Sequence, residues 1–504
     1  MDILNRGKMK TRKHIILFTA GCSLFLASCK KTEWLNPEPS TYITDGTAFS
    51  TPERILNQVN GLYSGLKAGN FLGSWYTIIS DVRTGEFHCS NMNAASGATM
   101  YSMLPQTTTS DVTNIWVAGY AAINRVNVFL DGLDQGGDAV LQADVANAYR
   151  AEAKLVRAVA YYYLLQMYAR PYWDANGSKP GLPLRLKGNT GPGDYSLKRS
   201  SVAETYAQII EDLDFAEQNL PSTYSSAFLN TSRAHKNTAI ALKTRVYLSI
   251  GDYPKVITEA NKIVPSTGTL VAGSGVANKL EANVANVFKS PYTSNESIFS
   301  MPFTSNDNPG SAISRYYLPG TGDGGTSTSN GAGEYSLNKI EGIYASSNWK
   351  ATDARKGLTV LGSRTGKVWL SKFNQASPYL DYVPVIRYAE VLLNLSEALA
   401  RSTQSIDSRS LSLFNAVYGR SNEGESLATA DFANATAFLE RIIEERRIEF
   451  LGEGIRNGDL MRLGLTIPAK SQHAIQAIAS DDPAYILPIP SDELILNKEM
   501  ENND

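Results

Sequence analysis

Cys29 is the residue of the sequence with the most clearly predicted chemistry, because it follows the small residues Ala27 and Ser28. Small side chains next to the scissile bond, followed by a thiol that can carry diacylglycerol, are typical of the site cut by lipoprotein signal peptidase. The preceding apolar run, residues 15–27, is 13 residues long and has a basic flank. It is too short to span a bilayer and typical of a secretory signal peptide. The sequence therefore predicts removal of residues 1–28 and a lipid anchor on Cys29.

Residue patterns for catalysis are absent from the sequence. A glycosidase needs two carboxylates beside its sugar, but among 49 acidic residues such pairs arise by chance. Beyond the signal segment the histidines are His88, His235 and His473, which are too scattered to suggest a metal triad. The glycine-rich residues 320–333 lack the Gly-Lys-Ser/Thr ending of a phosphate-binding loop. We therefore expect no catalytic residues, no metal, no cofactor and no enzyme activity.

Other classes of partner are also disfavoured. Cys89 is the one cysteine left after processing and lipidation, so neither a disulfide nor a thiolate metal site can form. Asp307, Asn308 and Asp323 offer loop oxygens, but the spacing of an EF-hand calcium loop is missing. The formal net charge is −2, and no basic block follows the signal segment, which argues against binding of nucleic acid.

Helical periodicity dominates residues 49 to 265. Residues 151–170 carry apolar side chains at near-helical spacing and end before Pro171. A second helix is predicted over residues 201–220, before a proline. Residues 237–264 predict two helices joined by a turn that starts at Gly251, an αα-hairpin. Such hairpins resemble tetratricopeptide (TPR) units, although no strict period of about 34 residues is visible.

The middle of the chain has a different composition, because Gly, Ser, Thr and Asn become frequent. Short β-type runs occur there at residues 297–303 and 368–373, and helices are predicted again at 384–401 and 431–450. The predicted fold class is dominated by α-helices: a TPR-like scaffold of helical hairpins with a loop-rich middle region that carries short strands.

The expected domain organisation is simple. Residues 29–48 are polar and contain prolines, which predicts a tether. Residues 49–504 are expected to form a single body whose parts are helical (49–265), loop-rich (266–380), helical (381–465) and a C-terminal tail (466–504).

The densest pattern of charge lies in residues 439–464, LERIIEERRIEFLGEGIRNGDLMRLG. Its acids and arginines have helical spacings that allow them to pair. The planar fork of arginine can bind a carboxylate and backbone carbonyls together. We interpret this segment as a partly buried ion network that fixes the helix to the scaffold, and not as a catalytic centre.

This segment and four further features, in the same order along the chain, resemble the SusD/RagB family. The family pattern E-R-R-x-E, E-G-x-R, Asp, Arg is matched by Glu445, Arg446, Arg447, Glu449, Glu453, Gly454, Arg456, Asp459 and Arg462. The other matches are Arg387, Tyr388, Glu390 and Glu397 in one helix, the LPIP tail with Glu493 and Asn497, the helix with Arg157, and the lipoprotein signal. Ile455, Asn457 and Tyr418 depart from the family pattern and leave the subfamily unassigned.

The resemblance implies a binding protein of the outer membrane that faces the cell exterior and is anchored by its lipid. Such proteins bind glycans, or peptides in some branches, and deliver them to a SusC-like TonB-dependent transporter. A peptide-binding member and a TPR-like adaptor that binds proteins alone stay open as alternatives. A hydrolase is the remaining alternative, and it would release product on incubation.

Sugar binding uses aromatic faces against the C–H side of a pyranose and polar groups at the rim. Two stretches of the sequence offer that combination, and from them we predict the ligand contacts Trp75, Tyr76, Asp81, Tyr316, Tyr344 and Trp349. Trp75 and Trp349 are favoured because Gly, Ser and Asn surround them. Core packing is the competing interpretation for each aromatic residue, and it is the expected one for Trp116 and Trp369.

Overall fold

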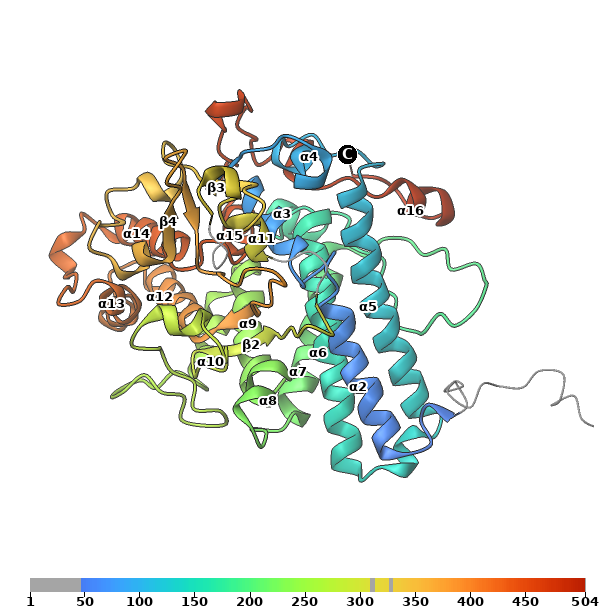
Figure 1. Cartoon of the computed structure of the whole chain (residues 1–504). Helices are drawn as coiled ribbons and strands as arrows, with labels where there is room; N and C mark the ends of the chain where they lie inside the picture. Colours follow the sequence, from blue (N-terminus) through green and yellow to red (C-terminus); the bar gives the residue numbers. More distant parts are fainter. Residues whose placement is uncertain (1–46, 309–312, 326–329, 504) are drawn as a thin grey trace, which may run out of the picture. The chain divides into compact units, whose positions relative to one another are not determined.

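Pairs of helices form the scaffold of the computed structural model, which describes residues 47–308, 313–325 and 330–503 (Figure 1). Residues 51–504 make up one unit. The signal segment, Cys29 and nearly all of the predicted tether lie outside the described residues. The helices of the N-terminal half are α2 (Pro52–Leu66), α3 (Trp75–Arg83), α4 (Ala98–Tyr101), α5 (Ser110–Asp134), α6 (Ala143–Tyr168), α7 (Val202–Asn219), α8 (Ala227–Ser232), α9 (Lys236–Ile250) and α10 (Tyr253–Ala260).

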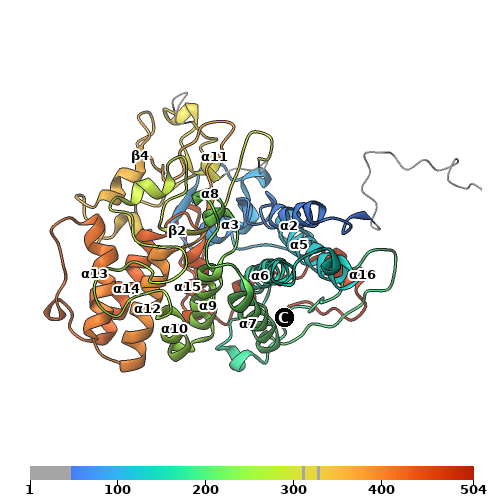
Figure 2. The same ribbon diagram turned by 90° about the horizontal axis from the view of Figure 1, so that it is seen from below.

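The helices of the C-terminal half continue the same scaffold. They are α11 (Ile313–Tyr317), α12 (Tyr388–Thr403), α13 (Ser408–Ser421), α14 (Ala435–Glu449), α15 (Ile455–Leu463) and α16 (Ser491–Leu496). Figure 2 shows a row that runs from α2 and α5 through α6, α7, α9 and α10 to α12 and α13, and consecutive members of this row contact one another. Within the described residues, no helix is both long and apolar enough to cross a membrane.

Local sequence signals set several of the helix ends. At the start of α7, Ser201 and Glu204 form a reciprocal capping box, and Pro221 follows the helix. The predicted hairpin at residues 237–264 is present as α9 and α10. Gly251 ends α9 at φ 77°, a left-handed conformation that glycine adopts without strain, and the Asp252 side chain caps α10.

The predicted start of one helix was wrong. The sequence predicts a helix over residues 384–401, but Val383–Arg387 is strand β6 and α12 starts at Tyr388. Val383, Val385 and Ile386 are β-branched, and Pro384 keeps its predecessor extended, so these residues suit a strand. The strand forms because β2 (Ser297–Met301), distant in sequence, pairs with it.

The described chain contains three two-stranded antiparallel sheets, and each has at least one strand in the loop-rich region. One pairs β1 (Phe87–Cys89) with β3 (Tyr335–Leu337), the second pairs β2 with β6, and the third pairs β4 (Thr359–Leu361) with β5 (Val368–Leu370). β2 and β5 lie in the two predicted β-type runs. The first two sheets join segments far apart in sequence, and the third closes a short hairpin. Because β1 follows α3 and β6 precedes α12, the first two sheets attach the loop-rich region to these helices.

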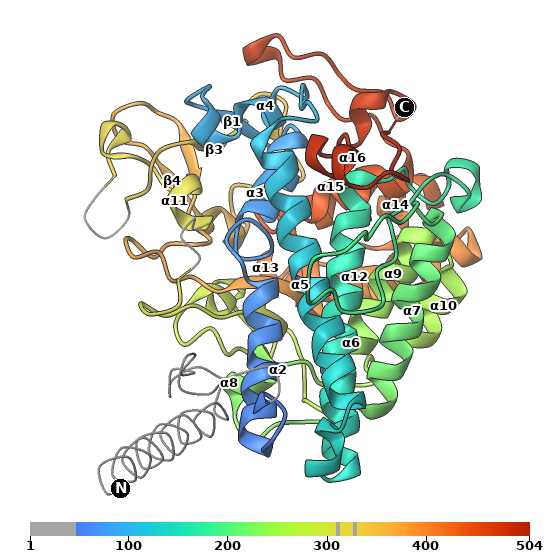
Figure 3. The same cartoon turned by 90° about the vertical axis from the view of Figure 1, so that its right-hand side faces the viewer.

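The C-terminal tail returns to the N-terminal helices, beside the ends of α5 and α6 (Figure 3). The Leu487 amide donates to the carbonyl of Met167, and the Asn503 side chain donates to the carbonyl of Tyr168. Asn497 exchanges two hydrogen bonds with the backbone of Leu197. The tail therefore satisfies the backbone at the C-terminal end of α6.

Candidate ligand-binding groove

Trp75 and Tyr316, both predicted as ligand contacts, meet in the structure but are buried, with exposed fractions of 6% and 7%. Their ring centroids lie 5.0 Å apart. The Trp75 indole Nε1 donates to the Asp111 carboxylate at 2.8 Å. The pair therefore fixes the N-terminus of α3 against α11 and α5 in this structure.

Asp81 and Tyr76, on the same helix, are also buried. Asp81 accepts hydrogen bonds from the Tyr317 hydroxyl at 2.8 Å and from the Gly454 amide at 3.1 Å. Burial raises the pKa of Asp81 to about 8, so its carboxyl group is protonated at neutral pH. Tyr76 packs edge-on against Tyr163, with ring centroids 4.8 Å apart.

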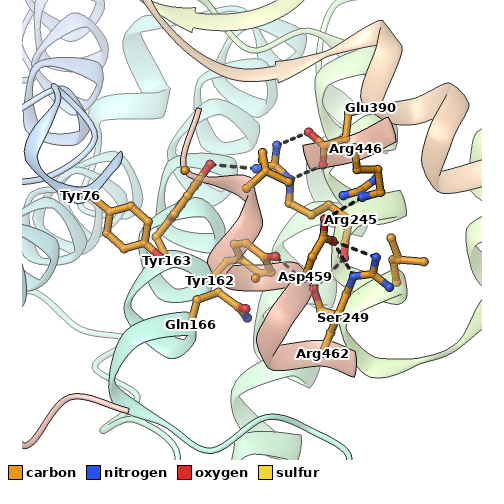
Figure 4. A pocket seen from close by; sticks show the side chains of 14 residues that line it. Tyr76, Tyr162, Tyr163, Gln166, Arg245, Ser249, Glu390, Arg446, Asp459 and Arg462 are labelled. Atoms are coloured by element: carbon orange, nitrogen blue, oxygen red, sulfur yellow. Dashed lines mark hydrogen bonds and ion pairs between the residues drawn. The ribbon is translucent and has the colours of Figure 1, made fainter. Parts of the chain in front are cut away.

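Tyr76 also lines a small cavity between α3, α6, α9 and α15 (Figure 4). Its volume is about 30 Å³, which suits one water molecule and excludes a sugar ring. The surrounding charges are already paired: Arg245 contacts both carboxylate oxygens of Glu390, at 2.7 and 2.6 Å, and Arg446 contacts Asp459 at 2.9 Å. This cavity therefore belongs to the structural core.

Tyr344 and Trp349, the other two predicted aromatic contacts, form a second pair. Their rings meet edge-on with centroids 5.5 Å apart, and Trp349 is buried while Tyr344 is half-buried. The Lys356 ammonium lies 3.7 Å from the Tyr344 centroid and 4.1 Å from that of Trp349, a cation–π arrangement. The neighbouring Asn348 is exposed and donates to Glu444 of α14 at 2.6 Å. This contact ties the aromatic pair to a groove along α14.

The groove along α14 has a volume of about 860 Å³, within the range of sites for small ligands. Apolar side chains supply part of its wall: Leu427, Phe432, Ala433, Ala437, Leu439, Ile443, Leu463 and Leu465. Charged and polar groups supply the rest: Asn348, Arg401, Asp431, Thr436, Glu440, Arg441, Glu444, Arg447 and Arg456. Apolar area combined with many hydrogen-bonding groups suits a saccharide, which has apolar C–H faces and a ring of hydroxyls.

Helix α14 faces the groove with one side and a buried ion network with the other. On the buried side, Glu449 accepts from Arg387 at 3.0 Å and from Arg355 at 3.1 Å, and it also pairs with Arg420. The nearby guanidinium groups hold the pKa of Glu449 well below its usual range, despite burial that acts to raise it. The interpretation of this segment as a structural ion network is confirmed. Most of its pairs, however, join different elements instead of successive turns of one helix.

The groove itself was not found from the sequence. Its α14 wall consists of residues three or four positions apart, such as Ala437, Glu440, Glu444 and Arg447. That stripe is visible in the sequence, but a solvated helix face has the same pattern. The residues that close the groove, Asn348, Arg456 and Leu465, come from other parts of the chain. Among the described residues, no group of three or more His, Cys, Asp or Glu side chains is arranged to hold a metal ion.

Two family models match the sequence. The model described as "Starch-binding associating with outer membrane" matches residues 33–248. The model described as "SusD family" matches residues 314–504. Among individual proteins, the SusD-like protein P2 of Formosa agariphila is 24% identical, over 95% of this chain and 97% of its own length.

Solved structures show the same fold. A SusD superfamily protein from Bacteroides fragilis is 30% identical with a TM-score of 0.79, over 90% of this chain and 99% of its own. The surface glycan-binding protein A of Bacteroides thetaiotaomicron, solved in complex with laminarihexaose, is 19% identical with a TM-score of 0.69, over 90% of this chain and 99% of its own. The mostly helical architecture predicted from the sequence is the architecture of this superfamily.

Proposed function

Because the chain belongs to the SusD/RagB family, we propose that it captures an oligosaccharide or polysaccharide at the cell surface and delivers it to a SusC-like TonB-dependent transporter. Members of the family are non-catalytic binding proteins, which agrees with the lack of catalytic motifs in the sequence. The structural relative that holds laminarihexaose supports a glycan, in preference to a peptide, as the ligand.

The groove along α14 is the observation that carries this proposal. Its volume of about 860 Å³ admits several sugar rings, while the cavity beside Tyr76 admits one water. Phe432 offers an aromatic face that is partly open to solvent. Carboxylates such as Glu440 and Glu444 can accept hydrogen bonds from sugar hydroxyls.

The predicted contacts at Tyr344 and Trp349 belong to this proposal, since their loop borders the groove through Asn348. The contacts predicted for Trp75, Tyr76, Asp81 and Tyr316 stay predictions. These four side chains are buried in the structure, and so is that of Trp349. We also propose that the protein is attached to the outer membrane through lipid on Cys29 and faces the exterior. The lipoprotein signal and the outer-membrane description of the matching family support this location.

Calorimetric titration of the full chain in detergent micelles tests the function, with a panel of polysaccharides and a peptide digest as ligands. We expect saturable binding of a polysaccharide and weakening by at least about tenfold in Ala437→Trp, because the indole fills the groove. Ala207→Trp, at an exposed position of α7 outside the groove, is the matched control and should bind normally. Binding of peptides alone would move the protein to the peptide branch, and binding unchanged by Ala437→Trp would exclude the groove.

A further inference from the structure

Two neighbouring ion networks meet at α14, and they differ in their balance of charge. The first consists of ten groups linked by ion pairs: Arg355, Lys372, Arg387, Arg420 and Arg441 with Glu296, Asp353, Glu445, Glu449 and Glu453. Its five cations face five carboxylates. This network is neutral, and its side chains are at most 9% exposed; Arg441 is the one member that also lines the groove.

The second set of charges lies around α15 and next to the groove. Its ion pairs link Arg401, Arg446, Arg447, Arg456 and Arg462 to only Glu86, Glu397 and Asp459 among the described residues. Five guanidinium groups therefore share three carboxylates. The side chains of Arg401 and Arg447 are 22% and 23% exposed, so water solvates part of this surplus, whereas that of Arg456 is 12% exposed. An uncompensated charge away from water is costly.

One excess cation lies at Arg447 and Arg456, which both line the groove and share Glu86. Arg447 Nε donates to Glu86 at 2.8 Å, while Arg456 Nε lies 3.9 Å from the same oxygen, beyond hydrogen-bond distance. Nε and Nη1 of Arg456 are buried and lack a hydrogen-bond partner among the described residues. Burial and the charge of Arg447 lower the pKa of Arg456 to about 10, which still leaves it charged at neutral pH.

The other charged groups of the groove do not neutralise this end. Asp431, Glu440 and Glu444 line the groove, but none forms an ion pair with Arg447 or Arg456 in the described structure. Glu444 accepts hydrogen bonds from Asn348 and Ser346 instead. Arg447 and Arg456 have guanidinium donors that Glu86 does not satisfy, and the nearby carboxylates can accept hydrogen bonds from hydroxyl groups. Together these groups match a sugar that carries both hydroxyls and an anionic group.

We propose that the α14 groove selects an acidic glycan, whose carboxylate or sulfate group is bound by Arg447 and Arg456. This inference rests on the proposed glycan-binding function and specifies its ligand class. The anion supplies the negative charge that the Arg447–Arg456–Glu86 cluster lacks. It also provides acceptors for guanidinium donors, and the apolar wall of the groove packs against the sugar rings.

Paired ligands that differ in charge alone provide the test. The full chain in detergent micelles is titrated with polygalacturonate and its carboxyl-reduced form, and with a sulfated galactan and its desulfated form. We expect the acidic member of at least one pair to bind about tenfold or more tightly in 50 mM NaCl, the range for a charge-assisted hydrogen bond. The ratio of the affinities for the acidic and neutral forms should become smaller at 500 mM NaCl, because salt screens the attraction between the arginines and the anion. A preference within the polygalacturonate pair identifies a carboxylate as the recognised group, and a preference within the galactan pair identifies a sulfate.

Variants separate binding from folding. Arg456→Met and Arg447→Gln should reduce the preference for the acidic form to about twofold or less, while Arg364→Gln, an exposed arginine outside the groove, should retain it. Because Arg456 is a surplus buried cation, Arg456→Met should leave the melting temperature unchanged or raise it, in contrast to the loss of a structural ion pair.

Equal binding of the charged and neutral forms, or a preference that survives Arg456→Met, would overturn this inference and leave glycan binding intact. Failure to bind any of the four glycans or any polysaccharide of the wider panel would overturn the proposed function as well.

Discussion

Arg387 is a central residue of the buried ion network, because it pairs with three of its carboxylates. Its guanidinium is 1% exposed and contacts Glu453 through two nitrogens, each at 2.8 Å, while the same group also pairs with Glu449 and Glu296. Its removal leaves three buried carboxylates with one cation fewer. A neutral side chain of similar length cannot replace these interactions.

We predict that Arg387→Met lowers the free energy of unfolding by about 3–5 kcal/mol, the usual result of breaking a buried ion network. Urea unfolding at pH 7 measures the change. Lys498→Met is the control, since Lys498 and Asp194 form a largely exposed pair at 3.5 Å, and its effect should stay below about 0.5 kcal/mol. A loss of less than about 1 kcal/mol for Arg387→Met would show that the network contributes little.

Asp81 links a single residue to the pH dependence of stability. Its folded-state pKa of about 8 lies above the unfolded value of about 3.9. Between these two values the folded state holds a proton that the unfolded state has released. The free energy of unfolding therefore falls as the pH rises from about 4 to about 8, by at most about 1.4 kcal/mol per pH unit from this group.

We predict that Asp81→Asn removes this contribution. The amide is neutral at every pH, its oxygen can accept from the Gly454 amide, and its NH₂ group can donate to Tyr317. The stability of the variant relative to the natural protein should rise between pH 5 and 8 and then level off. Urea unfolding of both proteins across this range is the measurement, and parallel pH profiles would contradict the assigned pKa.

At the scale of elements, the α9–α10 hairpin depends on one glycine. Gly251 has φ 77°, and its amide donates to carbonyls in the last turn of α9. A Cβ built at this position would meet no atom within 4 Å, so a substitution causes no clash. Any cost of Gly251→Ala must therefore come from the left-handed backbone conformation.

We predict that Gly251→Ala lowers the free energy of unfolding by about 1 kcal/mol. Gly357→Ala is the matched control, because Gly357 has equally open surroundings without a positive φ. Thermal and urea unfolding of the two variants compare backbone strain directly. Equal stability of both would mean that the turn relaxes to an ordinary conformation at little cost.

At the scale of the whole molecule, α14 lies between the buried ion network and the groove that we propose as the binding site. Its inner side is held by the neutral network that reaches β6 through Arg387 and the loop before β4 through Arg355. Its outer side forms the wall of the groove. The network thus fixes the groove wall in place, and Arg441 is its one member that also lines the groove. A binding site proposed on such a wall is preorganised.

Attachment to the membrane is the second property that we propose for the whole molecule, and the proposal places the lipid on Cys29. We predict that Cys29→Ala prevents incorporation of a labelled fatty acid in the producing bacterium and moves the protein from the membrane fraction to the soluble fraction. Cys89→Ala is the control, because Cys89 is buried and should not affect labelling. Retention of label by Cys29→Ala would place the lipid elsewhere or exclude it.

Local patterns in the sequence were sufficient for helices α6, α7 and α14, for the hairpin at Gly251 and for the family. Helical periodicity, caps and prolines act between residues a few positions apart, so they can be read without knowledge of the fold. The charged motif likewise predicted a buried ion network, although not its partners. Arg355 and Glu445, for example, are 90 positions apart and meet through packing of the loop on α14.

Tertiary structure alone decided strand β6, the burial of the predicted aromatic contacts and the position of the groove. Strand β6 depends on pairing with β2, and Trp75 is buried because α5 and α11 cover it. The groove forms where Asn348, the segment before α14, α14 itself and α15 converge. Burial and concavity are properties of contacts between segments distant in sequence, so composition and spacing could predict the chemistry of these residues but not their exposure to a ligand.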